Sequence, residues 1–377
     1  MRSFEDRFAE VGGFGPGFDA LRLVLCYEVV VWHAWTIGAG SPLPGKASLF
    51  WIPFETMVPM FFALSGFLVA GSAVRLNVRQ FMLSRSLRIL PALAAVVGLS
   101  ALVIGPMMTD RGLLAYVGDQ RFITYFLNVV GVVRYTLPGV FTDSPLGPAV
   151  NGSLWTVPWE ITCYLIMATL MAAGQLKRWW LLMVVALLWL CVATIYAFTA
   201  QGQEPQLIHK LLRFGLTTQG ALLIPYFLGG AGFYLARRHI PFDGRIAAVI
   251  IAMLVATSLL VDGLTWSKSP VLALLMLFPC VYLVAWLGLL KLPRPPGFRS
   301  GDYSYGVYLC HFPILQAMQA SFAFSHWGWL LLASLLPVTL FAASSWHMIE
   351  APMLAQRKRF SLLGRRLAGE LNPPAAP

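Results

Sequence analysis

Long apolar runs recur along nearly the whole chain, separated by short polar stretches that carry most of the charged residues. Each run approaches the ~20 residues that an α-helix needs to cross the hydrocarbon of a bilayer. The runs are uniformly apolar and do not alternate, which favours helices over the strands of a membrane barrel. The pattern predicts an all-α, polytopic transmembrane helical bundle with eleven candidate segments, near residues 18–38, 52–74, 87–108, 122–137, 154–174, 179–199, 217–236, 245–262, 269–290, 303–322 and 329–350.

The composition of the 377 residues supports a membrane protein, because 58% are hydrophobic and only 11% are charged. A soluble domain carries about 25% charged residues, so this chain could not cover itself with a solvated surface. The net charge of +11 does not indicate nucleic-acid binding, since the basic residues form short clusters between the apolar runs. The five cysteines all fall inside apolar runs without metal-ligand spacing, so neither a disulfide framework nor a metal site is expected.

Basic residues decide how many segments cross, because short cytoplasmic loops are enriched in Lys and Arg. Arg75, Arg79, Arg85 and Arg88 lie between the second and third segments and are therefore predicted to be cytoplasmic. If segment 122–137 crossed the membrane, every later basic cluster would lie outside. If it does not cross, 19 of the 27 Lys and Arg residues lie inside.

The second arrangement predicts about ten spans, with both termini in the cytoplasm and the chain in the plasma (inner) membrane. Segment 122–137 would be re-entrant or interfacial, which suits its short length and its Asn128, Gly131 and Arg134. Residues 1–355 would form the transmembrane domain, and 356–377 a basic cytoplasmic tail that is disordered at its end.

The first predicted helix carries ionisable residues that are costly inside a membrane and are therefore functional candidates. Arg22 and His33 are eleven residues apart, which places them on one helical face with a separation of roughly 16 Å. Such a face could contact a long ligand that lies along the membrane normal. The alternative is that His33 is a buried residue that only joins helices by hydrogen bonds.

The second cluster is Asn151-Gly-Ser-Leu-Trp-Thr-Val-Pro-Trp-Glu160. Asn151 and Ser153 can cap the start of the next helix, and Glu160 then lies at a depth similar to that of His33. A carboxylate there could orient the imidazole and raise its basicity. Glu55 is a competing partner for His33, and a structural role for Glu160 beside an arginine is the alternative.

Two further clusters lie on the third and tenth predicted spans. Arg85 and Arg88 share one face at a helix start and suit phosphate recognition, although they also serve as a topology anchor. His311 lies near the middle of its span, two residues before Pro313, which frees the carbonyl of Leu309 and kinks the helix. Glu350 closes the last span and is expected to form a structural ion pair.

Six short motifs together resemble the integral-membrane acyltransferase-3 family, in the family's order and over essentially the whole chain. They are Phe18-Asp-Ala-Leu-Arg22 with His33, Phe61-Phe-Ala-Leu-Ser-Gly-Phe-Leu68, Arg85-x-x-Arg88-Ile-x-Pro91, Asn151-Gly-Ser-Leu-Trp-Thr-x-x-x-Glu160, Ser304-Tyr-Gly-x-Tyr-Leu-x-His-x-Pro313 and Ile349-Glu-x-Pro352.

The resemblance implies a stand-alone, ten-helix O-acyltransferase without a fused extracytoplasmic domain. Such enzymes move an acyl group, usually acetyl, from cytoplasmic acyl-CoA to a hydroxyl of exopolysaccharide, O-antigen, peptidoglycan or a related carbohydrate acceptor. The resemblance makes His33 the catalytic histidine with Glu160 beside it, and it makes Arg22, Arg85 and Arg88 the donor site. Candidate acceptor or oxyanion contacts are Ser65, Asn151, Ser153, Trp155, Tyr308 and His311.

The expected partners are the lipid bilayer, acyl-CoA as co-substrate and the carbohydrate acceptor, with polysaccharide-export machinery as a further candidate and no bound cofactor. His33 could act as a general base or as a covalent acyl carrier. The rival function is a transporter, a flippase or a glycan polymerase or ligase without acyl transfer. Transporters tend to show internal repeats, and this sequence has none.

Overall fold

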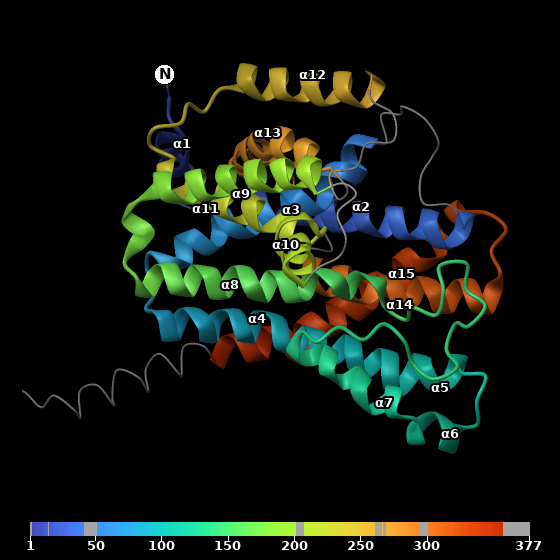
Figure 1. Ribbon diagram of the computed structural model, residues 1–377. Helices are drawn as coiled ribbons and strands as arrows, with labels where there is room; N and C mark the ends of the chain where they lie inside the picture. The colour runs from blue at the N-terminus through green and yellow to red at the C-terminus, as the bar shows by residue number, and fades with distance from the viewer. Residues whose placement is uncertain are drawn as a thin grey trace, which may run out of the picture.

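The computed structural model describes residues 2–13, 15–40, 51–200, 207–260, 266, 269–293 and 301–356. Long helices run side by side through this part of the chain, and its extended backbone forms isolated bridges without any strand (Figure 1). The predicted all-α helical bundle is therefore confirmed. The predicted tail at 356–377 lies outside the described residues, except for its first residue.

The chain alternates long helices with short connecting ones. The longer helices are α1 (Phe4–Glu10), α2 (Phe18–Ala39), α3 (Trp51–Ala73), α4 (Val78–Gly98), α8 (Val157–Ala172), α9 (Trp179–Thr199), α10 (Leu207–Thr217), α11 (Ile224–Ala236), α12 (Gly244–Leu260), α13 (Pro270–Gly288), α14 (Ser304–Phe322) and α15 (Trp327–Ser345). The short ones are η1 (Leu99–Ile104), α5 (Gly105–Met108), α6 (Leu113–Gly118), α7 (Gln120–Tyr125), η2 (Phe126–Val130), η3 (Gly152–Thr156), η4 (Gln175–Lys177), η5 (Ala221–Leu223) and η7 (Trp346–Glu350).

Seven helices among the described residues are long and apolar enough to cross a membrane, or eight if α10 and α11 form one bent span. Each of the ten predicted crossings contains a helix. However, α12 with its 17 residues is too short for a span by this criterion, and α14 carries polar residues such as His311 and Gln316, so length and composition alone do not assign these two. The number ten therefore stays a prediction.

No long helix forms over residues 122–137. After α7 and η2, the chain turns at Gly131, whose φ of 82° favours glycine. The Asn128 side chain closes this turn by donating to the Arg134 carbonyl and accepting from the Arg134 N–H at 2.9 and 2.8 Å. Its placement in a membrane, re-entrant or interfacial, stays a prediction.

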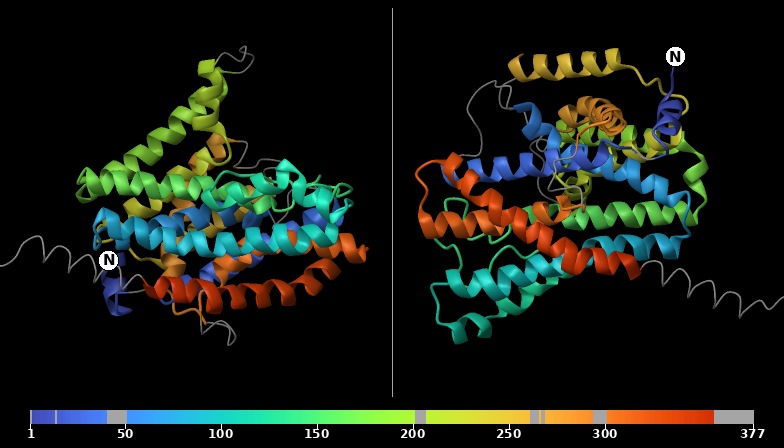
Figure 2. Two further views of the ribbon diagram at one scale, coloured as in Figure 1. Left: turned by 90° about the horizontal axis from the view of Figure 1, so that it is seen from below. Right: turned by 180° about the vertical axis from the view of Figure 1, so that it is seen from behind.

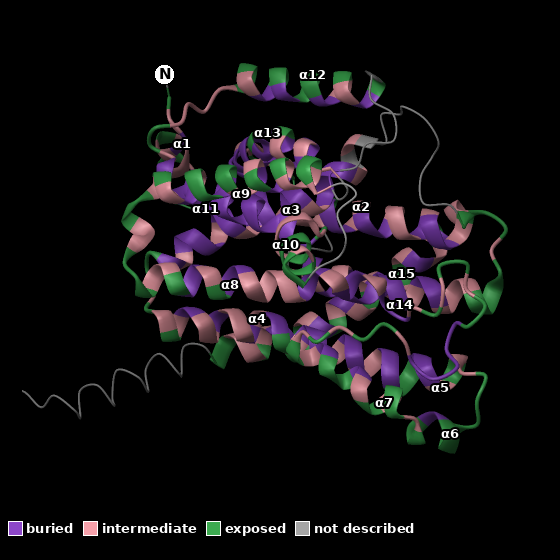
Figure 3. Ribbon diagram, viewed as in Figure 1, coloured by how far each residue is buried: buried purple, intermediate pink, exposed green. Residues whose placement is uncertain are grey.

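The core lies where α3 packs against α11 and α13, and the outward faces of the surrounding helices are exposed (Figure 3). Gly66 of α3 and Gly230 of α11 make this approach possible. A Cβ at either position would overlap the facing carbonyl oxygen, of Phe227 or Ala63 respectively. Small residues allow this close packing of helices inside a membrane.

The N-terminus, the turn between α3 and α4, the turn between α8 and α9 and the α11–α12 connection gather at one end of the bundle (Figures 1 and 2). The Phe4 N–H donates to Ile240 at 3.0 Å, and the Arg7 side chain donates to the Leu289 carbonyl at 3.2 Å. Several of the basic clusters that were predicted to share the cytoplasmic side thus lie at the same end of the bundle. We call this end of the bundle the N-terminal end.

Candidate active site

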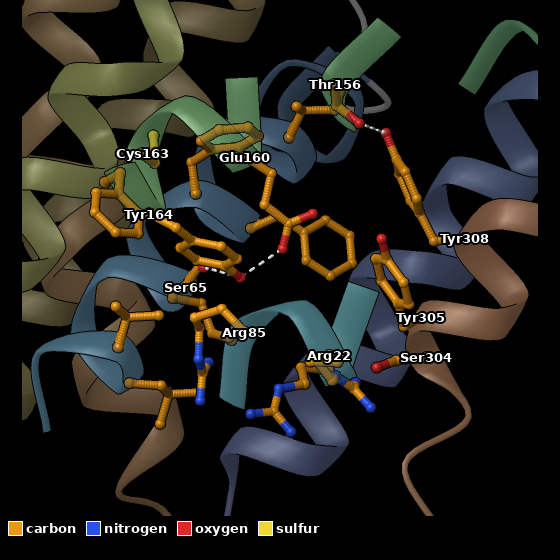
Figure 4. A pocket seen from close by; sticks show the side chains of 18 residues that line it. Arg22, Ser65, Arg85, Thr156, Glu160, Cys163, Tyr164, Ser304, Tyr305 and Tyr308 are labelled. Atoms are coloured by element: carbon orange, nitrogen blue, oxygen red, sulfur yellow. Dashed lines mark hydrogen bonds between the residues drawn. The ribbon is translucent and has the colours of Figure 1, made fainter. Parts of the chain in front are cut away.

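The described residues contain a cavity of about 140 Å³ between α2, α3, α4, α8, α11 and α14. Arginines lie at one side of it, Glu160 and Tyr164 near its middle, and Thr156 with Tyr308 at the other side (Figure 4). Its lining consists of Arg22, Val58, Phe61, Phe62, Leu64, Ser65, Leu68, Val69, Arg85, Arg88, Thr156, Glu160, Cys163, Tyr164, Phe227, Ser304, Tyr305 and Tyr308.

Two of the three cavity arginines share one carboxylate. Arg22 and Arg88 donate to the same oxygen of Asp302 at 2.9 and 2.7 Å, and Ser304 donates to the other oxygen at 2.6 Å. Burial acts to raise the pKa of Asp302, but Arg88 and Arg22 outweigh it and hold that pKa well below its usual range. Asp302 is therefore ionised at neutral pH. Glu350, 3.6 Å from Arg88, adds the structural ion pair that was expected of it.

Arg85 differs from its two neighbours because it forms no ion pair with a carboxylate of the described residues. Its guanidinium lies over the rings of Tyr164 and Phe81, at 5.8 and 6.0 Å from their centroids. It donates one long hydrogen bond, of 3.4 Å, to Ser84, and its buried Nε has no partner. The aromatic rings stabilise the cation without using its N–H groups. Arg85 thus keeps donors for an anion.

Glu160 and Tyr164 form a pair within α8. The Tyr164 hydroxyl donates to the carboxylate of Glu160 at 2.6 Å, and Ser65 lies 3.5 Å from the same hydroxyl. The two residues are four positions apart, so they share a helix face. The predicted contact between Glu160 and His33 does not form: the partner of Glu160 is Tyr164, and that of His33 is His311. The competing partner, Glu55, accepts from the Trp266 N–H at 2.9 Å.

His33 instead meets His311 of α14. Its Nδ1 lies 2.8 Å from Nε2 of His311, and the Nδ1 of His311 lies 3.0 Å from the carbonyl of Val307. His311 is fully buried, whereas His33 is partly exposed. Neither histidine lines the cavity, but Tyr308 does, and its ring centroid is 6.1 Å from that of His311. The histidine pair therefore lies one residue layer beyond the cavity.

The loop before α8 holds α14 in place. Asn151 donates to the Leu309 carbonyl at 2.8 Å, which is the carbonyl that Pro313 was predicted to free. Its side-chain oxygen accepts from the N–H and hydroxyl of Ser153 at 3.1 and 2.6 Å, so Asn151 caps the start of η3 as expected, whereas Ser153 lies inside η3 and caps no helix. Asn151, Ser153 and Trp155 do not line the cavity, whereas Ser65 and Tyr308 do.

The family model for an acyltransferase domain, acyltransferase-3, matches residues 16–346. The chain belongs to the acyltransferase-3 family. It is 30% identical to "Nodulation protein 10" of Rhizobium leguminosarum bv. viciae, over 94% of this chain and 97% of that protein. It is 25% identical to the "O-acetyl transferase" of Shigella phage Sf6, over 90% of this chain and 96% of that protein. No solved structure matches.

This acyltransferase-3 protein is therefore an enzyme, a multi-pass membrane O-acyltransferase. Sequence reasoning did not single out several of the residues that shape its cavity: Tyr164, Tyr305, Thr156 and Asp302. Tyr164 follows Glu160 by four positions, which is a spacing that predicts a contact on a helix. No local spacing signals that Asp302 meets Arg22 and Arg88, since those residues are far apart along the chain.

Proposed function

We propose that this enzyme transfers an acyl group, with acetyl as the first expectation, from acyl-CoA to a hydroxyl of a cell-surface or exported carbohydrate. Arg85 carries the donor half of this proposal, because its guanidinium lines the cavity without a carboxylate partner among the described residues. Arginine binds phosphate groups through paired, charge-assisted hydrogen bonds. The phosphates of CoA are anions of this type. Tyr305, whose buried hydroxyl has no hydrogen-bond partner in the part of the chain that the structure describes, is a further donor.

The size of the cavity limits which part of the donor can enter it. Pockets for drug-sized ligands are roughly 300–1,000 Å³, so a cavity of about 140 Å³ has room for the thioester arm only. The nucleotide of CoA would then remain at the N-terminal end of the bundle, near the arginines. The arm would pass Glu160 and Tyr164 and point its acyl group toward Tyr308.

In this proposal His33 acts as a general base. Its imidazole takes the proton of the acceptor hydroxyl while the hydroxyl oxygen bonds to the acyl carbon. The carbon–sulfur bond then breaks, and the CoA thiolate leaves and recovers that proton from the imidazole. The small separation between Tyr308 and the histidine pair supports this route, since only one residue layer lies between the cavity and His311.

The N-terminal end would face the cytoplasm, where acyl-CoA is made, and the carbohydrate would approach from the opposite side. Sidedness can be tested in membrane vesicles from cells that make the protein. We expect radiolabelled acetyl-CoA, added outside inverted vesicles, to label an alkali-sensitive ester on the enclosed glycan. Intact right-side-out vesicles should stay unlabelled, because the donor cannot reach its site.

The controls separate acyl transfer from other membrane activities. Vesicles with His33→Ala should remain unlabelled, and deletion of the gene should remove the same ester from the surface glycan in vivo. If labelling persists in His33→Ala vesicles, His33 is not the general base. Equal labelling of both vesicle orientations would contradict the sidedness.

A further inference from the structure

The protons of the His33–His311 pair can be placed from its acceptors. A carbonyl oxygen only accepts hydrogen bonds, so Nδ1 of His311, 3.0 Å from the carbonyl of Val307, must carry a proton. His311 is fully buried and forms no ion pair within the described part of the chain, so it is neutral. A neutral imidazole has one N–H, and Nε2 of His311 is therefore an acceptor.

The same reasoning fixes the tautomer of His33. Its Nδ1 lies 2.8 Å from Nε2 of His311, which accepts, so Nδ1 of His33 must donate. The neutral His33 then has its lone pair on Nε2. No hydrogen bond to this second nitrogen occurs among the described residues, and the side chain is partly exposed. His33 thus presents a free basic nitrogen, with its N–H turned toward α14.

The surroundings hold His311 in this position. Two points in the turn of α14 that precedes it are anchored: Val307, which receives its N–H, and Leu309, whose carbonyl is bound by Asn151. The next residue, Phe312, contacts the edge of the His33 ring at 5.0 Å between centroids and packs against Gly152, where a Cβ would collide with it. Neither imidazole can rotate without breaking one of these contacts.

We propose that His311 is a positioning residue that holds His33 in the Nδ1–H tautomer and leaves Nε2 free to act as the base. This inference rests on the proposed function of His33 and changes the role of His311 from a contact of the acceptor to a partner of the base. When Nε2 of His33 takes the hydroxyl proton, the resulting imidazolium donates through Nδ1 to the lone pair of His311. The Val307 carbonyl polarises His311 in turn, and such chains strengthen each hydrogen bond.

The tautomer can be measured without any catalytic assay, which keeps this inference separable from the proposed function. The protein contains six histidines, and ¹⁵N NMR of the histidine-labelled, purified protein distinguishes protonated from bare ring nitrogens. The His33 signals are assigned by their loss in His33→Gln. We expect the Nδ1–H form in the unaltered protein and a shift toward the Nε2–H form in His311→Leu.

Acyl transfer gives the second readout. His311→Leu should lower kcat on the order of 10²-fold and leave the KM for acyl-CoA unchanged, since a base in the wrong tautomer binds substrate normally. His311→Gln keeps an acceptor oxygen near the position of Nε2, so it should recover most of the activity. His326→Gln is the matched control, because this exposed histidine caps α15 away from the pair.

An Nε2–H form of His33 in the unaltered protein would overturn the inference. So would an unchanged tautomer in His311→Leu, or equal activity of the Leu and Gln variants. If His311→Leu fails to fold, the spectrum of the unaltered protein and the activity of His311→Gln still test the positioning role of His311. If the tautomer is as expected but His33→Ala transfers acyl groups normally, the proposed function fails and the positioning role has no catalytic meaning.

Discussion

The arginine side of the cavity and the histidine pair differ in how their buried polar side chains are stabilised. Arg22 and Arg88 are paired with Asp302, Asp19 and Glu350, in a network whose arginine and Asp302 side chains are about one-fifth exposed. His33 and His311 carry no counter-ion among the described residues and are joined by a chain of hydrogen bonds that ends on a backbone carbonyl. The arginine region consists of permanently charged side chains, whereas the histidine pair contains a neutral base that can accept a proton.

The difference indicates that the two regions have separate roles, donor binding at the arginines and proton transfer at the histidine pair. Fixed cations suit a donor whose phosphates are always charged, whereas a base must change its charge during the reaction and return to neutral afterwards. An ion pair at His33 would favour its protonated form and so occupy the lone pair that the reaction needs. Substitutions confined to one region should therefore leave the function of the other region unchanged.

The largest effect is expected at the histidine pair. His33→Ala should reduce acyl transfer by about 10³-fold, because general bases contribute typically 10²–10⁴-fold. Binding of acyl-CoA should remain within about twofold of the unaltered protein, since the arginines line the cavity and His33 does not. Transfer is measured in inverted vesicles and binding by calorimetry on purified protein. A large loss of donor affinity would show that the two regions are not separate.

Arg85→Gln should produce the converse result, a higher KM for acyl-CoA with a nearly unchanged kcat. A hydrogen bond to a charged group is worth about 1.5–3 kcal/mol, which corresponds to an affinity loss of roughly 10- to 100-fold. Arg245→Gln serves as the control, because this exposed arginine begins α12 and does not line the cavity. If both variants bind acyl-CoA equally well, Arg85 is not part of the donor site.

Asp302→Asn should act mainly on stability. The substitution removes the carboxylate that Arg22 and Arg88 share. Arg22 keeps only Asp19 and Arg88 only Glu350 as ion-pair partners among the described residues, so we expect a loss of about 2 kcal/mol, less than for a fully buried pair. Glu10→Gln is the matched control, since Glu10 also contacts two arginines, Arg2 and Arg7, but its side chain is 49% exposed. Surface pairs contribute about 0–1 kcal/mol. Thermal unfolding in detergent compares the two, and equal midpoints would show that Asp302 is not the anchor of the network.

How far the sequence predicted this molecule depends on the range of each interaction. The long apolar helices and the carbonyl freed by Pro313 follow from local pattern, and the structure agrees with both. The partner of His33 did not follow, because His311 reaches it only through the packing of α2 on α14, 278 positions apart. Glu160 was assigned to His33 by depth, although Tyr164, one turn away, was the nearer partner. The depth of a residue along the helix bundle predicts which residues lie at the same level in the membrane. It does not predict which of those residues are in contact.

The smallest effect concerns the anchor of α14, and it can be isolated by a double-mutant cycle. Asn151→Ala removes the donor to the Leu309 carbonyl and should cost about 1–3 kcal/mol, the usual penalty for an unsatisfied buried group. In the Pro313→Ala background the helix regains a backbone N–H that can bond to this carbonyl, so the same substitution should cost about 1 kcal/mol less. Unfolding of the four proteins measures this coupling. Strict additivity would mean that Asn151 acts through its cap on Ser153 alone, and that the helix carrying His311 is positioned without it.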